Sequence, residues 1–286
     1  MQIKNYLSLV KFSHTIFAMP FAMIGFFLAI NQTENSFDWK ILIFIVLCMI
    51  FARNAAMGFN RFADRKIDKK NPRTTNREIP AGIIKEKSAI LFVIINSLLF
   101  VSSTFFINEL VFWLSPVALF IILAYSLTKK YTSICHFILG LGLSLAPIGA
   151  YLSVSEQFAL LPVLFSFVVL FWVSGFDIIY ALQDEEFDNL ENLKSIPAFL
   201  GKPKALKVSF SIHIIVALLI VFVGFYGSFG LLFWIGSLIF IVLLFYQHFI
   251  VKADDLSRIN LAFFTTNGIA SVVFAIFVIF DFYLKI

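Results

Sequence analysis

The sequence has few charged residues. Asp, Glu, Lys and Arg make up 14% of its 286 residues and hydrophobic residues 60%, whereas globular proteins average roughly 25% charged and 45–50% apolar. This composition excludes an ordinary soluble domain. The two cysteines, Cys48 and Cys135, both lie in apolar stretches, which argues against a disulfide framework and a thiolate metal site. The histidines lack the spacing of metal ligands, so we expect core or interface positions for His14, His136, His213 and His248.

Long hydrophobic runs take up most of the chain, and its mean hydropathy is +0.95. Each run is close to the roughly 20 residues that a helix needs to cross a hydrocarbon core about 30 Å thick. No cleavage site follows the first run, so we expect it to be retained. We predict an all-α polytopic membrane protein, a single domain over residues 1–286, with nine transmembrane helices at about 12–30, 39–59, 88–107, 110–127, 134–152, 158–180, 205–225, 229–251 and 262–284.

Basic residues are distributed unequally between the two sides of these runs. Twenty of the 22 Lys and Arg fall on the side of the N-terminus, and only Lys40 and Lys285 fall on the other side. The positive-inside rule then predicts an integral protein of the cytoplasmic membrane, with the N-terminus inside and the C-terminus outside. Because the basic residues record topology in this way, we expect no nucleic-acid partner.

Two long polar segments, about 60–87 and 181–204, interrupt the hydrophobic pattern on the cytoplasmic side. We expect each to begin as a continuation of the preceding helix, and we expect the active site to lie there. The segments also resemble one another at an offset of 120 residues, because NRFADRKID (60–68) aligns with YALQDEEFD (180–188). This match favours a weak internal duplication in which each half contributes one acidic helix end.

The first segment carries an amide and two carboxylates on one helical face. Asn60, Asp64 and Asp68 are spaced four residues apart, so each step turns by only about 40° around an α-helix. Like charges in this arrangement destabilise a helix unless a cation binds between them.

The second segment predicts a similar stripe, which rises from the end of the sixth run. Its members are Asp177, Tyr180, Asp184 and Asp188. Asp177 is expected at membrane depth, where an ionisable group is unfavourable unless it faces a cavity or a partner, so it is a functional candidate. We interpret the acids beside the stripe as solvated helix-end residues: Glu185, Glu186 and Glu191.

Facing carboxylates and an amide provide the oxygen ligands that Mg²⁺ prefers, and Mg²⁺ commonly completes its coordination with water and substrate phosphate. Basic residues accompany them in the sequence: Arg53, Arg61, Arg65, Lys66, Arg73, Arg77, Lys129 and Lys130. Acids that hold Mg²⁺ beside bases that hold an anion indicate a diphosphate site. The polar stretches around Arg73 and Arg77 are expected to fold over this site as a lid.

These motifs resemble those of the UbiA superfamily of intramembrane aromatic prenyltransferases. NRFADRKID (60–68) is similar to the first family motif, N-x-x-x-D-x-x-x-D, and DIIYALQDEEFD (177–188) to the second, D-x-x-Y-x-x-x-D-x-x-x-D. NREIPAG (76–82), YSLTKKYT (125–132) and KFSHTIFAMPFA (11–22) also look like family segments. The resemblance extends over nearly the whole chain.

The resemblance implies a helical bundle with a central cavity, a polyprenyl diphosphate donor and two Mg²⁺ ions. The metal ligands that it implies are Asn60, Asp64, Asp68, Asp184 and Asp188. We assign diphosphate binding to Lys129, Lys130, Arg73, Arg77 and Tyr180. Where the family pattern has Lys-Arg, this chain has Lys129 and Lys130, and a lysine does not form the bidentate fork of an arginine.

We therefore predict Mg²⁺-dependent transfer of a polyprenyl group to a ring carbon of 4-hydroxybenzoate or a similar aromatic acid, in ubiquinone or menaquinone biosynthesis. The catalytic residues would be Asp64, Asp68, Asp184, Asp188 and Asp177. The family places the acceptor near the first motif, so Arg53 is our candidate for binding its carboxylate. Asp177 would take up the ring proton or orient the phenol.

Two alternatives stay open. The acceptor can be a dihydroxynaphthoate-type acid in a menaquinone route. In a different class, the chain can be an ion-coupled transporter, which would place ionisable groups near the midplane and on paths to both faces.

Overall fold

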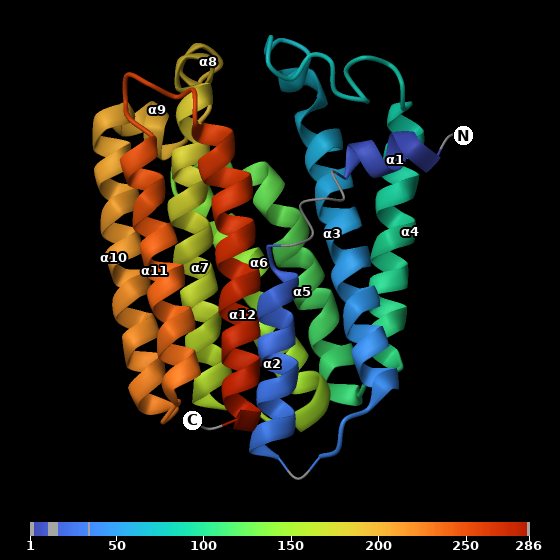
Figure 1. The fold of residues 1–286 in the computed structure, drawn as a ribbon. Coiled ribbons are helices and arrows are strands. Elements are labelled where there is room, and N and C mark those ends of the chain that lie inside the picture. The colour runs from blue at the N-terminus through green and yellow to red at the C-terminus, as the bar shows by residue number, and fades with distance from the viewer. Residues whose placement is uncertain (1–2, 11–16, 34, 285–286) are drawn as a thin grey trace.

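The computed structural model describes residues 3–10, 17–33 and 35–284, and this part of the chain contains helices and no strands. The long helices run side by side in one bundle (Figure 1). The predicted all-α class is confirmed. The elements are α1 (Ile3–Leu9), α2 (Met19–Gln32), α3 (Trp39–Asp68), α4 (Glu86–Phe105), α5 (Glu109–Thr128), α6 (Cys135–Ser155), α7 (Leu160–Ala181), η2 (Leu182–Asp184), α8 (Glu185–Leu190), α9 (Ile196–Leu200), α10 (Lys202–Tyr226), α11 (Leu231–Ile250), η3 (Leu261–Thr266) and α12 (Asn267–Leu284).

Eight helical stretches among the described residues are long and apolar enough to cross a membrane, which makes the chain an integral membrane protein. The remaining predicted run corresponds to α2, an apolar helix of 14 residues. Its predicted beginning, residues 12–16, lies outside the described residues, as does His14. The described helix begins at Met19, where Pro20 occupies the first turn and removes an N–H that has no helical partner.

Helices that follow one another in the chain pack against each other through most of the bundle: α3 on α4, α5 on α6, α6 on α7, α7 on α10, and α11 on α12. α12 also packs on α2, and α2 packs on α6, which closes the arrangement. At that last contact a Cβ atom added to Gly25 would lie 2.0 Å from the carbonyl oxygen of Pro147, so only glycine permits the close approach. Buried aromatic side chains fill the interior, among them Phe21, Trp172, Phe240 and Phe274.

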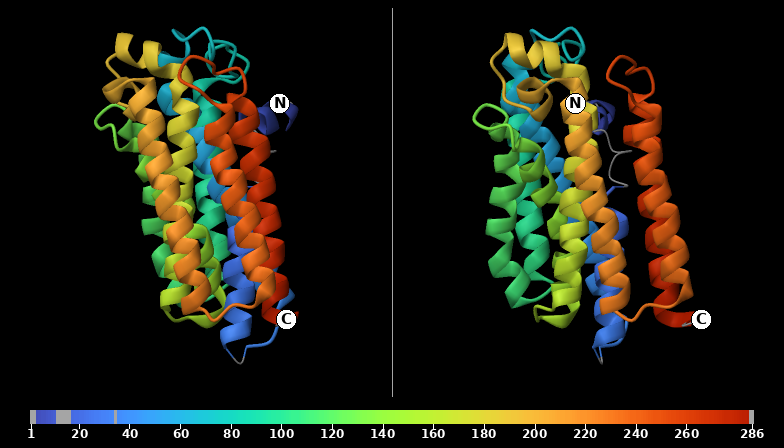
Figure 2. Two further views of the ribbon diagram at one scale, coloured as in Figure 1. Left: turned by 60° about the vertical axis from the view of Figure 1, so that its left-hand side comes forward. Right: turned by 90° about the vertical axis from the view of Figure 1, so that its left-hand side faces the viewer.

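The two ends of the bundle differ. One end, which we call the polar end, carries α8, α9 and the loops 69–85 and 251–260, as the views from several sides show (Figures 1 and 2). At the opposite end the chain makes short connections. There the Asp281 carboxylate accepts hydrogen bonds from the backbone nitrogens of Gly230 (2.8 Å) and Phe233 (3.1 Å), and so caps the start of α11.

The two polar segments continue their preceding helices to different extents. α3 runs unbroken to Asp68, as predicted. The prediction of one continuous helix through the second stripe is wrong, because α7 ends at Ala181 and the chain tightens into the 3-10 turn η2 before α8 begins. The break turns Leu182 into the core, where it is fully buried, and the Gln183 side chain donates to the carbonyl oxygen of Tyr180 at 3.1 Å. Asp184 and Asp188 therefore do not share one helical face.

Candidate active site

A cavity of about 550 Å³ lies at the polar end, enclosed by α3, α5, α6, α7, α8, η3 and the loop 69–85. All twelve site residues predicted from the sequence line its wall: Arg53, Asn60, Asp64, Asp68, Arg73, Arg77, Lys129, Lys130, Asp177, Tyr180, Asp184 and Asp188. Segments that are more than 100 residues apart in the chain thus meet around one space. Two basic residues of the first segment, Arg65 and Lys66, do not line the cavity. Arg65 instead pairs with Glu86 at 2.8 Å.

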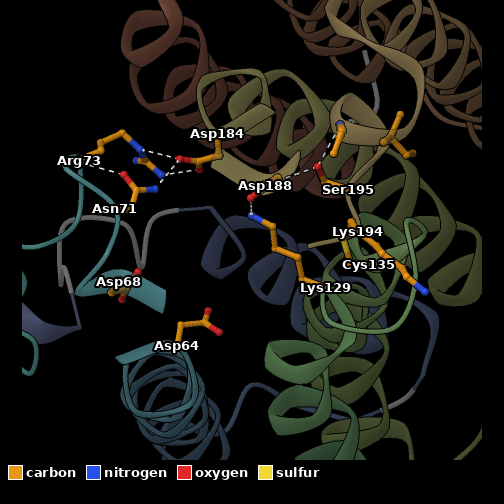
Figure 3. A network of polar contacts seen from close by, with 12 residues as sticks. Asp64, Asp68, Asn71, Arg73, Lys129, Cys135, Asp184, Asp188, Lys194 and Ser195 are labelled. Carbon is orange, nitrogen blue, oxygen red and sulfur yellow. Dashed lines mark hydrogen bonds and ion pairs between the residues drawn. The ribbon is translucent and has the colours of Figure 1, made fainter. Parts of the chain in front are cut away.

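The acids of α3 face the cavity from one helical face. The Asn60 amide donates to Oδ2 of Asp64 at 3.2 Å. Oδ1 of Asp68 pairs with Arg77 at 2.7 Å, and Oδ2 of Asp68 is buried with no hydrogen-bond partner among the described residues. Within the described part of the chain no lysine or arginine forms an ion pair with Asp64, which lines the cavity (Figure 3).

Asp184 is held by the loop 69–85. The Arg73 Nε donates to its Oδ1 at 3.0 Å, and the Asn71 amide donates to the same oxygen at 3.3 Å (Figure 3). Arg73 also donates from Nη1 to the Tyr180 hydroxyl at 3.3 Å. Burial lowers the pKa of the Arg73 guanidinium, but the Asp184 carboxylate more than offsets this and the pKa is raised. Asn71 and Arg73 of the predicted lid thus bind Asp184, one of the predicted metal ligands.

Asp188 is fully buried and is held by the opposite wall. Its Oδ1 lies 2.7 Å from the Lys129 ammonium, and its Oδ2 accepts a hydrogen bond from the Ser195 hydroxyl at 2.8 Å (Figure 3). Burial lowers the pKa of Lys129, but Asp188 outweighs burial and the net shift is upward. Lys130 points elsewhere, because its ammonium donates to the carbonyl oxygen of Ala63 on α3 at 3.3 Å.

These pairings bear on whether the site suits a metal ion. No three His, Cys, Asp or Glu side chains lie close enough to hold a metal within residues 3–10, 17–33 and 35–284. Three of the four motif acids are instead paired with cations. The donor set nevertheless fits Mg²⁺, since α3 presents an amide, the Asp64 carboxylate without an ion pair and the unpartnered Oδ2 of Asp68.

Deeper in the cavity, α3 presents two arginines that are eight residues apart. Arg53 and Arg61 both line the wall, with Met57 between them and Tyr125 of α5 nearby. Arg61 is only 5% exposed, and its Nε is buried without a hydrogen-bond partner among the described residues. A buried guanidinium nitrogen that lacks an acceptor is unfavourable, so this region favours an anionic ligand group. The sequence grouped Arg61 with the other cations but did not separate it from Arg65.

An aromatic wall completes the cavity opposite α3. Its rings are Phe17, Phe176, Tyr180, Phe263 and Phe264, with the ring centroids of Tyr180 and Phe263 4.1 Å apart. Phe263 and Phe264 lie in η3, a π-helical turn, and the Asn267 side chain donates to the Phe263 carbonyl at 3.1 Å. The sequence analysis did not predict this turn, because a single π turn inside an apolar helix does not interrupt the hydrophobic run.

His136 is a further residue that sequence reasoning did not assign to the site. The expectation of a buried position holds, since it is 2% exposed, but it also lines the cavity. Its Nδ1 lies 2.7 Å from Oδ2 of Asp177. Ser195 was also missed, and for both residues the partner is distant in sequence or lies beyond a helix break.

Comparison with known proteins connects this site to a family. The UbiA prenyltransferase family matches residues 18–269. The chain is 30% identical over 240 residues to a 4-hydroxybenzoate octaprenyltransferase of Aliivibrio fischeri (strain MJ11), which covers 83% of this chain and 82% of the relative. It is 27% identical over 242 residues to the enzyme of that name from Francisella tularensis subsp. holarctica (strain LVS), which covers 85% of each.

Solved structures agree with this relationship. The apo structure of a UbiA homolog from Aeropyrum pernix K1 superposes with a TM-score of 0.80 at 27% identity, over 93% of this chain and 95% of that one. A UbiA homolog from Archaeoglobus fulgidus, solved bound to GPP and Mg²⁺, shares the fold with a TM-score of 0.75 at 23% identity, over 98% of this chain and all of that one.

Proposed function

Because this chain belongs to the UbiA prenyltransferase family, we propose that it transfers a polyprenyl group from polyprenyl diphosphate to a ring carbon of 4-hydroxybenzoate or a similar aromatic acid, as a step of lipoquinone biosynthesis. The observation that carries the proposal is the pairing of motif acids with cations from other segments around one cavity. Relatives named 4-hydroxybenzoate octaprenyltransferase support this choice of acceptor.

The paired charges suit a diphosphate with its metal ions. The acids Asp68, Asp184 and Asp188 now neutralise Arg77, Arg73 and Lys129. On substrate binding these cations would turn to the diphosphate oxygens, and the acids, together with Asn60 and Asp64, would become ligands of two Mg²⁺ ions. When bound, Mg²⁺ neutralises charge that develops on the diphosphate as the C–O bond breaks.

The remaining diphosphate contacts come from Tyr180 and Lys130. The Tyr180 hydroxyl already accepts a hydrogen bond from Arg73, so it lies beside the proposed diphosphate position. Lys130 would contribute as a point charge rather than as a fork. The prenyl chain, being apolar, would lie against the aromatic wall and the lipid-facing part of the bundle, where ring faces stabilise positive charge.

The acceptor would bind in the deeper part of the cavity. Arg53 would hold the carboxylate, and Asp177 would face the reacting ring. The wall also contains Met57, Leu139 and Leu143, which suit the faces of an aromatic ring. A dihydroxynaphthoate-type acid has the same carboxylate and a larger ring system, so it is the alternative acceptor.

A direct assay tests the function. Membranes that contain the protein are incubated with labelled polyprenyl diphosphate, Mg²⁺ and either 4-hydroxybenzoate or a dihydroxynaphthoate, and lipid products are separated. We expect a prenylated acid, and its formation should stop when Mg²⁺ is chelated. Absence of any prenylated product with either acid, with the donor intact, would contradict the proposal. Such a result would favour the alternative function, an ion-coupled transporter.

The orientation is proposed from charge alone, with the polar end and its active site in the cytoplasm. A reporter inserted in the loop 69–85 should be active only inside, and a reporter fused to the C-terminus only outside. The reverse pattern would overturn the orientation without affecting the proposed chemistry.

A further inference from the structure

The cavity wall contains a hydrogen-bonded pair that no motif predicted. His136, near the start of α6, and Asp177, near the end of α7, are joined by a contact of 2.7 Å between Nδ1 and Oδ2. The Asp177 side chain is 22% exposed and that of His136 only 3%. The Asp177 carboxylate therefore faces the cavity, and the His136 imidazole contacts it from the buried side.

The other imidazole nitrogen is occupied by the backbone. Nε2 of His136 faces the backbone nitrogen of Ile196 at 3.3 Å, in a buried position. This contact leaves Nδ1 as the nitrogen that donates to Asp177, and the Asp177 carboxylate is the acceptor of the bond.

Close packing of α6 and α7 explains why the two side chains meet. A Cβ atom on Gly140 would lie 2.4 Å from the carbonyl oxygen of Leu170 and 2.6 Å from the Ser174 hydroxyl, so the helices approach closely at this point. The Ser174 hydroxyl also contacts the carbonyl oxygen of His136 at 3.3 Å. One turn further along each antiparallel helix, His136 comes against Asp177.

Asp177 differs from the other carboxylates of the cavity wall. Among the described residues, Asp68, Asp184 and Asp188 are paired with arginine or lysine, and Glu78 accepts a hydrogen bond from the Ser8 hydroxyl. Asp64 is the unpaired acid of the metal motif. Asp177 stands outside both motif acid pairs, has no lysine or arginine partner among the described residues and is held by a hydrogen bond from His136. A carboxylate that one hydrogen bond orients toward the cavity is suited to accept a proton.

We propose that Asp177 accepts the proton that the acceptor ring loses, and that His136 is the positioning residue that holds Asp177 for this step. The inference rests on the proposed prenyl transfer. In that reaction the C–O bond of the donor breaks and the diphosphate keeps its electron pair. The new C–C bond forms, and the proton on the substituted ring carbon passes to the Asp177 carboxylate, which restores the aromatic ring.

The segment that supports His136 also contacts the diphosphate side of the cavity. Ser195 donates to Asp188, and the next residue, Ile196, donates to His136. The backbone nitrogen of Lys194 donates a hydrogen bond to the carbonyl oxygen of Lys129 at 2.8 Å. Residues 194–196 thus contact Asp188, the proposed metal ligand, and His136, which positions the proposed proton acceptor. Diphosphate binding and proton removal therefore depend on the same short segment.

The experiment uses 4-hydroxybenzoate with deuterium on the ring carbons beside the hydroxyl, compared with the ordinary acid. Asp177→Asn and His136→Leu should each lower kcat, by about 10²-fold or more for loss of a general base, with the donor KM little changed. Because proton removal then limits the rate, both variants should show a primary isotope effect that the unmutated enzyme lacks. His136→Gln keeps a donor for Asp177 and should recover most of the lost turnover.

Controls separate positioning from folding and from failure of the proposed function. His248→Gln alters another hydrogen-bonded histidine, paired with His213 at 2.7 Å away from the cavity wall, and should leave turnover and isotope effect unchanged. The inference is overturned if His136→Leu retains full kcat, or if it is slow without an isotope effect. If the unmutated enzyme prenylates no aromatic acid, the proposed function itself has failed.

Discussion

The two acidic segments have the same four-residue spacing and different surroundings. On α3 the chain is an unbroken helix, and Asp64 and Asp68 project from one face into the cavity. In the second segment the helix breaks at η2, and Asp184 and Asp188 point toward opposite walls (Figure 3). Arg73 from the loop 69–85 holds the first of them, and Lys129 at the end of α5 holds the second.

The difference indicates unequal roles for the two segments. Asp64 has only the Asn60 amide as a hydrogen-bond partner among the described residues, so its charge is available to a ligand. Asp184 and Asp188 each connect segments that are distant in the chain and so stabilise the polar end as well as the site. Removing the charge of Asp64 should therefore affect chemistry, whereas removing that of Asp184 or Asp188 should also affect folding.

The largest expected effect is on turnover by Asp64→Asn. This change keeps the shape of the side chain and removes the charge of a proposed metal ligand, so turnover should fall by about 10²–10³-fold. Thermal unfolding in detergent should be unchanged or slightly improved, since no ion pair is lost. Assays of turnover and melting temperature on the same preparation check both parts.

A double variant sharpens this result. Adding Asp184→Asn to Asp64→Asn should reduce turnover little further, because residues that act as one unit are strongly non-additive. Fully additive losses would mean that the two segments do not serve one site, and turnover that survives chelation of Mg²⁺ would mean that they do not serve it through a metal.

Asp188→Asn should affect stability as well as turnover. The substitution removes the partner of Lys129 and weakens the bond from Ser195, and a hydrogen bond to a charged group is worth about 1.5–3 kcal/mol. We expect a lower free energy of unfolding than for Asp64→Asn, measured by thermal or chemical unfolding in the same detergent. Equal stability of the two variants would contradict the unequal roles.

Arg53→Ala tests the deeper part of the α3 face. Loss of one charge-assisted contact, about 1.5–3 kcal/mol, should raise the KM of the acceptor by roughly one to two decades and leave the KM of the donor nearly unchanged. Arg65→Ala is the matched control on the same helix, because Arg65 pairs with Glu86 outside the cavity wall. Equal prenylation of a decarboxylated acceptor by the unmutated enzyme would refute the assignment.

The smallest effect is expected for Glu185→Gln and Glu186→Gln. Both acids lie in the second segment but outside the cavity wall, and the Lys202 ammonium lies 3.5 Å from Glu185 and 3.6 Å from Glu186. Long, loosely paired contacts of this kind contribute roughly 0–1 kcal/mol, so turnover and stability should stay close to those of the unmutated protein. A large loss of turnover would place the acidic cluster of α8 inside the site.

Much of the site was predictable because its residues follow local rules. The stripe of Asn60, Asp64 and Asp68 depends only on the period of an α-helix, and α3 has that period. The second stripe was predicted by the same rule and the rule failed there, since burial of Leu182 and the bonds of Asp184 to Arg73 and Asn71 favour a tighter turn. The partners that decide this outcome lie more than 100 residues away in the chain.

The sequence by itself determined the class of the protein and identified the charged residues that gather around its cavity. Hydrophobic runs of spanning length require helices in a bilayer, because backbone groups must be satisfied within each segment, and the polar residues that interrupt the runs must gather where the runs end. Only the tertiary structure decided which acid meets which cation, how His136 reaches Asp177, and that η3 is a π-helical turn. These outcomes depend on how closely particular helices approach one another, which is set by side-chain packing across the bundle and not by the pattern along any one helix.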